Sequence, residues 1–259
     1  MAVISWLRFL GRTSILRNLK LVIAYDGTDF SGWQRQPDRR TVQQVLEEAI
    51  AALTGAMPTT NASGRTDAGV HALGQVIHFF TASPHSLEVF AKALNATLPR
   101  DVRVLSVEEK PQSFHCTFDA IRKRYRYVID NARISDPFAL RYSWYVFPRL
   151  DEAAMHRAGQ ALVGRHDFRS FETNWPNRTS SVRTIFALDV AREADRVTIE
   201  VEADGFLYNM VRAITGTLVV VGSGRRPESF PREALQAQSR AKAGPTAPPQ
   251  GLFLLRVHY

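Results

Sequence analysis

The feature that most constrains this chain is the short segment 64–71, which reads Gly-Arg-Thr-Asp-Ala-Gly-Val-His. Its one carboxylate, Asp67, lies between Gly64 and Gly69, and glycines adopt backbone conformations that other residues avoid. A strand-like run follows directly at 73–80, so the sequence predicts a tight loop anchored at its exit by a strand. Spacing alone leaves two interpretations open. The carboxylate bonds its own backbone in a turn, or it is presented to a substrate as nucleophile or base.

The charge of the chain favours a polyanionic partner. The 259 residues carry a formal net charge of +8, and 28 arginines with 5 lysines make up the 33 cationic side chains. Arginine pairs with phosphate oxygens and stacks on bases, so nucleic acid is the expected ligand. No apolar run reaches membrane-spanning length, and the single cysteine, Cys116, excludes an internal disulfide. We therefore expect a cytoplasmic protein with no membrane partner.

Hydrophobic periodicity predicts alternating strands and helices in two halves. In the first half we expect a strand at 19–25, a helix from Thr41 to Gly55, a strand at 73–80, a helix capped by Ser86 and a strand at 101–108. In the second half we expect strands at 117–129 and near 142–146, a helix at 151–163 capped by Asp151, a hairpin of 182–190 with 196–203, helices at 206–221 and 231–244, and a strand at 251–259. This order indicates an α+β fold.

Residues 1–18 fit no element of this pattern. Their apolar run is interrupted by Arg8, and no small-residue cleavage site follows it, so a signal peptide is disfavoured. We divide the chain into a poorly ordered extension at 1–18, a first α/β half at 19–112 that carries the Asp67 loop, and a second α/β half at 113–259.

Six motifs, in order, resemble those of the TruA-type tRNA pseudouridine synthases. Besides the Asp67 loop they are Tyr25-Asp26-Gly27 with Gly32-Trp33-Gln34-Arg35-Gln36, Phe114-His115, Arg124-Tyr125-Arg126-Tyr127, Met210-Val211-Arg212 and Gly251-Leu252. Together they cover the chain from about Leu19 to Tyr259. The resemblance implies two similar α/β halves whose antiparallel sheets join into one, with helices on one side and the active cleft between the halves. It also implies a homodimer.

The resemblance further implies an activity: conversion of uridine to pseudouridine in the anticodon stem-loop of tRNA, at positions 38, 39 and 40. The rearrangement is redox-neutral, so no cofactor is expected. Asp67 matches the family's catalytic residue. Its point of action stays open, because it can attack ribose C1′, attack the uracil ring, or act as a base at C2′.

The same resemblance implies the substrate-binding residues. Arg212 matches an arginine beside the catalytic Asp, where its charge would keep the carboxylate ionised. Tyr125 matches the tyrosine that lies against the uracil face, while Tyr127, on the same strand face, is assigned to the core. Arg65 is expected to fill the gap left by an extruded uridine, and Leu252 to form an apolar wall of the base pocket.

Further RNA contacts are expected from arginines near the predicted loop and strand of the cleft: Arg35, Arg39, Arg40, Arg124 and Arg126. Trp33 has two possible places, stacked on RNA or buried in the core. Two positions depart from the family pattern, since Asn209 stands where histidine is expected and Cys116 where alanine is usual. Neither change removes a group that the chemistry needs.

Two other functions compete with this interpretation. A non-catalytic RNA-binding protein of the same fold would be favoured if the catalytic residues were replaced, and none of them is. A metal-dependent nuclease would combine Asp67 with His71, His78 and His115. The spacings of these histidines match no standard ligand set, so we expect no metal site.

Overall fold

The structure is a computed structural model, and it describes residues 16–173 and 180–259. The first half of the chain forms β1 (Arg17–Tyr25), α1 (Val42–Thr54), β2 (Asn61–Ala62), β3 (His71–Thr81), α2 (Leu87–Thr97) and β4 (Val102–Lys110). The second half forms β5 (Arg122–Asp130), β6 (Trp144–Tyr145), α3 (Glu152–Gly159), β7 (Gly164–Asp167), β8 (Val182–Glu193), β9 (Arg196–Ala203), α4 (Met210–Gly222), α5 (Phe230–Ala237) and β10 (Leu252–His258).

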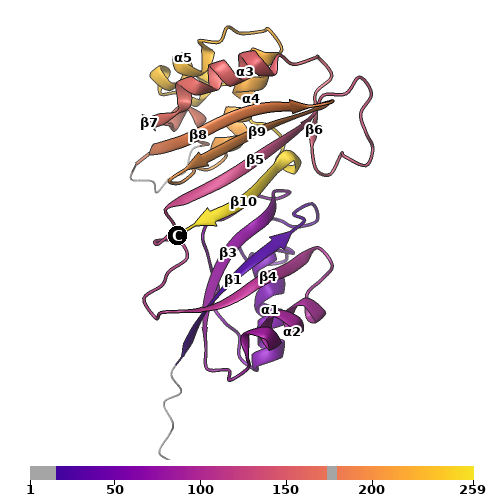
Figure 1. The fold of residues 1–259 in the computed structure, drawn as a ribbon, viewed down its shortest axis with the longest axis vertical. Coiled ribbons are helices and arrows are strands. Elements are labelled where there is room, and N and C mark those ends of the chain that lie inside the picture. The colour runs from indigo at the N-terminus through magenta and orange to yellow at the C-terminus, as the bar shows by residue number, and fades with distance from the viewer. Residues whose placement is uncertain (1–15, 174–179) are drawn as a thin grey trace, which may run out of the picture.

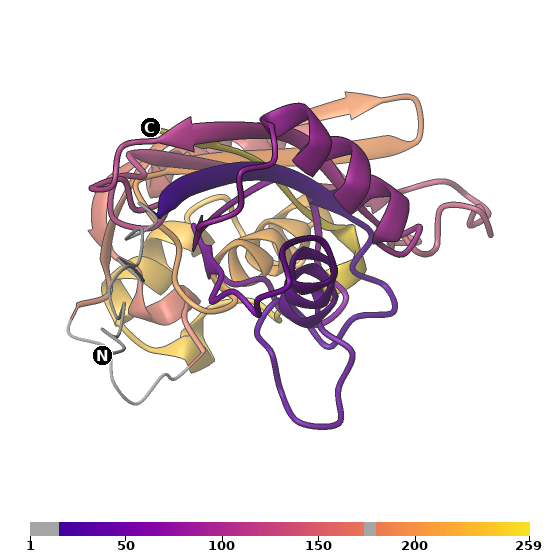
Figure 2. The ribbon, with the colours of Figure 1, turned by 90° about the horizontal axis from the view of Figure 1, so that it is seen from below.

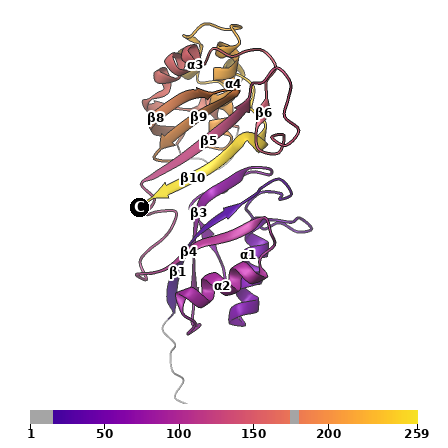
Figure 3. The same ribbon diagram turned by 45° about the vertical axis from the view of Figure 1, so that its right-hand side comes forward.

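Within these residues the strands form one sheet, which confirms the predicted α+β class (Figure 1). Its main order is β4-β1-β3-β10-β5-β9-β8-β7, with β2 paired to β3 and β6 to β5. Three strands of the first half are therefore neighbours, and so are five of the second. Figure 3 shows β10 between β3 and β5, where the two sets meet. The β3–β10 pair is parallel, whereas the other pairs along the main order are antiparallel.

The helices start where the sequence predicts caps. The side chains of Thr41, Ser86 and Asp151 each accept a hydrogen bond from a backbone N–H in the first turn, and Gly55 ends α1 in a left-handed conformation. Figure 2 shows α1 and α4 on the same side of the sheet. Helix α2 packs at the edge strand β4, where Asn95 exchanges two hydrogen bonds of 2.8 Å with the backbone of Val104. No helix in the described residues is long and apolar enough to cross a membrane.

Several predicted boundaries are wrong. The strand expected at 117–129 starts at Arg122, because the chain turns at 115–119, where Asp119 N–H donates to the His115 carbonyl. Helix α4 starts at Met210 instead of 206, because Asn209 has a left-handed backbone with φ of 62°. Helices α3 and α5 end earlier than predicted, and short 3₁₀ turns follow them. Strands β2 and β7 were not predicted. Strand β1 begins at Arg17, within the expected extension, and residues 1–15 of that extension lie outside the described residues. The division at 18 and 112 stays a prediction.

Tyr127 on β5 lies in the core behind the site. It is fully buried, its hydroxyl donates to the Pro248 carbonyl at 2.7 Å, and its ring meets Trp144 edge-on. We expect Tyr127→Leu to lower the free energy of unfolding by about 1–3 kcal/mol, because it leaves a cavity and an unpaired carbonyl. Tyr127→Phe keeps the ring and should lose only about 1 kcal/mol. Urea unfolding measures both, and a Leu variant as stable as the parent would contradict this assignment.

Candidate active site

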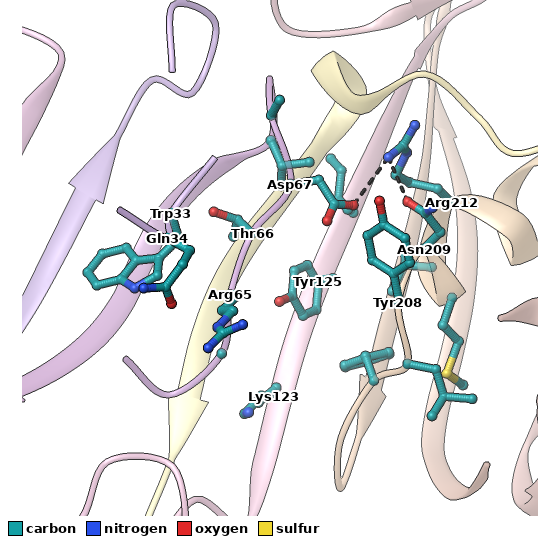
Figure 4. Close-up of a pocket in the computed structure, with 18 of the residues that line it drawn as sticks. Trp33, Gln34, Arg65, Thr66, Asp67, Lys123, Tyr125, Tyr208, Asn209 and Arg212 are labelled. Carbon is teal, nitrogen blue, oxygen red and sulfur yellow. Dashed lines mark hydrogen bonds and ion pairs between the residues drawn. The ribbon is translucent and has the colours of Figure 1, made fainter. Parts of the chain in front are cut away.

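A pocket of about 700 Å³ lies on the helix side of the sheet, and Figure 4 shows its lining side chains. Four segments meet there: the loop after β1, the 64–70 loop before β3, strand β5, and the segment 206–212 that enters α4. Leu252, the first residue of β10, completes the lining. Residues from both expected halves thus share one pocket.

The 64–70 loop is held from behind by buried groups. The backbone N–H of Trp33 donates to the Thr66 carbonyl at 3.0 Å, and the Tyr25 and Thr66 hydroxyls form a hydrogen bond of 2.8 Å. Gly32 has φ of 91°, and a Cβ there would lie 2.8 Å from the Thr66 oxygen, so only glycine fits. Trp33 is 2% exposed, which decides in favour of the core interpretation of this residue.

Asp67 is presented to the pocket, and within the described part of the chain its carboxylate has no hydrogen bond to its own backbone. The partner found in the described residues is Arg212, whose Nη1 lies 3.2 Å from Asp67 Oδ2 (Figure 4). The same guanidinium donates to the Ala247 carbonyl at 2.8 Å and to Asn209 Oδ1 at 2.7 Å. These two further acceptors fix the cation in place. The expected pairing of Arg212 with Asp67 is therefore present.

The environment of Asp67 makes its carboxylate more basic than usual. Burial raises the pKa of Asp67 above its ordinary value, and the charge and hydrogen bond of Arg212 offset only part of this rise. A carboxylate with a raised pKa is a stronger base and nucleophile once it is ionised. The raised pKa is thus compatible with Asp67 as a base or as a nucleophile.

Tyr125 contributes an aromatic surface to the pocket. Its side chain is 8% exposed, and its ring meets Phe206 edge-on at 4.9 Å between centroids. Burial strongly raises the pKa of Tyr125, so its hydroxyl stays protonated. Tyr127, two residues on, does not line the pocket. Tyr125 therefore lies at the pocket and Tyr127 in the core, as predicted.

Leu252 and Arg65 also line the pocket, as the sequence predicts, and Arg65 is exposed. Sequence reasoning missed Lys123 and Asn209 as pocket residues. The signal for Lys123 was available, because it lies two positions before Tyr125 and therefore on the same face of β5. The contact of Asn209 with Arg212 depends on the left-handed turn before α4, which no sequence pattern indicated.

The structure does not place Arg124 and Arg126 at the pocket. Alternation along β5 puts them on the opposite face from Tyr125, where both pair with Glu200 at 2.5 and 2.6 Å. The expectation that these arginines lie near the cleft is wrong for this reason, because it assigned both faces of the strand to one site. Their contact with RNA stays a prediction.

The three arginines after β1 lie beside the pocket around a second hollow. Arg35 pairs with Glu47 at 3.2 Å. Arg40 forms two hydrogen bonds to Asp101, at 2.8 and 3.0 Å, and stacks on a phenylalanine ring. Arg39 is exposed, and its side chain has no partner among residues 16–173 and 180–259. Arg39 is thus the member of this group that is open to a ligand.

The histidines considered for a metal site have other partners. His71 Nδ1 accepts from Gly27 N–H at 3.0 Å, and its Nε2 lies 3.0 Å from the Arg141 carbonyl. His78 packs against His115 with ring centroids 4.7 Å apart. In the part of the chain that the structure describes, no three His, Cys, Asp or Glu side chains are grouped to hold a metal ion.

Comparison with known proteins gives a consistent result. The family model described as "tRNA pseudouridine synthase" matches residues 21–119 and 158–259. A "tRNA pseudouridine synthase A" from Brevibacillus brevis is 48% identical over 94% of this chain and 100% of its own length. Proteins of the same name from Thermoanaerobacter pseudethanolicus and Listeria innocua are 42% and 45% identical over 94% and 93% of this chain, and over 100% and 98% of their own lengths.

Among solved structures, an H/ACA RNP bound to a substrate RNA containing 2′-deoxyuridine matches with a TM-score of 0.32. The match has 10% identity and covers 78% of this chain and 53% of the other, which is too weak to carry an argument. The family model and the relatives suffice without it. Because the model covers most of the chain and the relatives align over nearly all of it, this chain belongs to the tRNA pseudouridine synthase family.

Proposed function

We propose that this protein converts uridine to pseudouridine in the anticodon stem-loop of tRNA, at positions 38, 39 and 40, with Asp67 as its catalytic residue. The observation that carries the proposal is the ion pair of Asp67 with Arg212 at a pocket that Tyr125 also lines. A carboxylate held by a fixed cation, next to an aromatic surface, can bind a flat base and react with its nucleoside.

The reaction breaks the bond from uracil N1 to ribose C1′ and forms a bond from C5 to C1′. The proton on C5 is lost and N1 gains one, so the oxidation state does not change and no redox cofactor is required. Asp67 starts the sequence by attack on C1′ or on the ring, or by removal of a proton at C2′. Each route needs an ionised carboxylate, and the nearby Arg212 charge favours that form.

The detached base must stay in the pocket while it turns. Tyr125 offers its ring face, and Phe206 and Leu252 supply apolar surface around it. The Tyr125 hydroxyl, protonated because burial raises its pKa, is available as a hydrogen-bond donor or a proton relay. Arg65 is exposed at the pocket, which suits a side chain that fills the space left in the RNA by the extruded uridine.

Three further properties are proposed from the resemblance: a homodimer, a cytoplasmic location and catalysis without a cofactor. A non-catalytic RNA-binding protein is disfavoured, because Asp67, Arg212 and Tyr125 are all present and share the pocket.

Asp67→Asn tests the proposal directly, because it nearly keeps the shape of the side chain and removes its charge. We expect turnover of an anticodon stem-loop RNA to fall by at least about a thousandfold. Binding of the same RNA should change by less than about threefold, because the lost interaction is made with the reacting atoms. Stability should fall modestly, because Arg212 loses its counter-ion but keeps its hydrogen bonds to Ala247 and Asn209. Pseudouridine release assays and RNA titrations measure these effects, and substantial turnover by the Asn variant would remove Asp67 from its role.

The pH dependence of kcat/KM tests the role of Arg212. Activity needs ionised Asp67, so the rate should fall as pH decreases through the raised pKa of this carboxyl. Arg212→Met removes the cation that lowers this pKa, so the acid limb should move to higher pH, and Arg212→Lys should return it part of the way. Arg226→Met is the matched control, because this exposed arginine pairs with Glu233 instead. An acid limb that stays in place in Arg212→Met would contradict the pairing.

The salt dependence of binding separates Arg39 from Arg40. If Arg39 meets a phosphate, Arg39→Gln should reduce the slope of log K against log salt by about one. Arg40→Gln should reduce it less, because Asp101 already neutralises that charge. Titration of the stem-loop RNA over a series of KCl concentrations measures the slopes. A parental slope in Arg39→Gln would mean that this arginine is only a solvated charge.

A further inference from the structure

Lys123 is a pocket residue with no role in the chemistry described above. In Figure 4, Tyr125 is drawn between Lys123 and Arg65 on one side and the Asp67–Arg212 pair on the other. Lys123 and Arg65 both line the pocket, and among the described residues that line it Asp67 is the one acidic side chain. The pocket therefore has an ion pair at one side and two cations at the other.

Lys123 has no carboxylate partner. The structure shows no ion pair to it in the described residues, and the segments 1–15 and 174–179 contain no Asp or Glu. Its Nζ donates to the Ser63 carbonyl, and no other acceptor for its three N–H groups is found among residues 16–173 and 180–259. Burial lowers the pKa of Lys123, and the positive charge of Arg183 adds to this, while the nearby Cys116 thiol acts in the opposite direction. An anion bound here would offset both effects.

Each of the other four lysines either pairs with a glutamate or is exposed. Lys20 and Lys110 pair with Glu108, and Lys92 pairs with Glu88 at 2.7 Å. Lys242 is exposed to water. A partly buried lysine without a carboxylate is costly to keep charged, and the cost is recovered when a ligand supplies the negative charge.

We propose that Lys123 is a substrate-binding residue that contacts a backbone phosphate adjacent to the uridine held in the pocket. This inference rests on the proposed function, because that function places an RNA nucleotide against Tyr125. Uracil and ribose are neutral groups, and the phosphate is the anion that a nucleotide brings into such a pocket. Lys123 also contacts the carbonyl of Ser63, directly before the Asp67 loop, so phosphate and loop meet at one cation.

A double-mutant cycle between protein and RNA tests this contact. Three stem-loop RNAs are compared: the native one, and two in which the phosphate on the 5′ or the 3′ side of the target uridine is a neutral methylphosphonate. With native RNA, Lys123→Met should raise KM about tenfold and change kcat much less, because a charged hydrogen bond is lost on binding. With one of the two methylphosphonate RNAs, the same substitution should have no effect on KM.

Two control variants and three outcomes complete the test. Lys123→Arg should keep most of the affinity, and Lys92→Met should behave as the parent protein with every RNA. If Lys123→Met causes the same loss with all three RNAs, Lys123 supports the loop through Ser63 only and the inference is wrong. No loss with native RNA also refutes it. If the parent protein does not turn over native RNA, the proposed function fails, and the same cycle run on equilibrium binding still tests the phosphate contact.

Discussion

The ion pair between Asp67 and Arg212 is the interaction on which the rest of the site depends. It joins residues 145 positions apart, from the loop before β3 and from the first turn of α4. Neither element could place its charge in a buried pocket alone, because an unpaired buried charge tends to be neutralised. The continuous sheet brings the two together, since the parallel contact of β10 with β3 joins the strands of both halves.

Different residues of the pocket support the loop, offer an aromatic surface and, in the proposed arrangement, hold the RNA backbone. A backbone hydrogen bond from Trp33 and a side-chain hydrogen bond from Tyr25 set the Asp67 loop, so the loop does not depend on substrate for its shape. In the proposed reaction, Tyr125 would supply a surface for the base without using hydrogen bonds, which suits a base that must turn. In the proposed arrangement, Lys123 holds the RNA backbone while Asp67 acts on the nucleoside. The reacting atoms can then move while the nucleotide stays bound.

Local signals in the sequence predicted the elements well, because caps, glycines and alternation act over a few residues. Thr41, Ser86 and Asp151 cap the helices that they were expected to start. The pairing of Asp67 with Arg212 came from family resemblance alone, since no local pattern reports a contact over such a separation. The error for Arg124 and Arg126 has another cause. They were expected near the cleft because they lie on the strand of Tyr125, but alternation turns their side chains to the opposite face.

Mapping of pseudouridine in cellular tRNA tests the central claim most directly. In a strain that lacks this protein, uridines at positions 38, 39 and 40 should be unmodified, and the parent gene should restore pseudouridine there. A gene encoding Asp67→Asn, expressed at the same level, should restore none. Persistence of the modification in the deletion strain, or its return with the Asn variant, would contradict the assignment of Asp67 as the catalytic residue of a tRNA pseudouridine synthase.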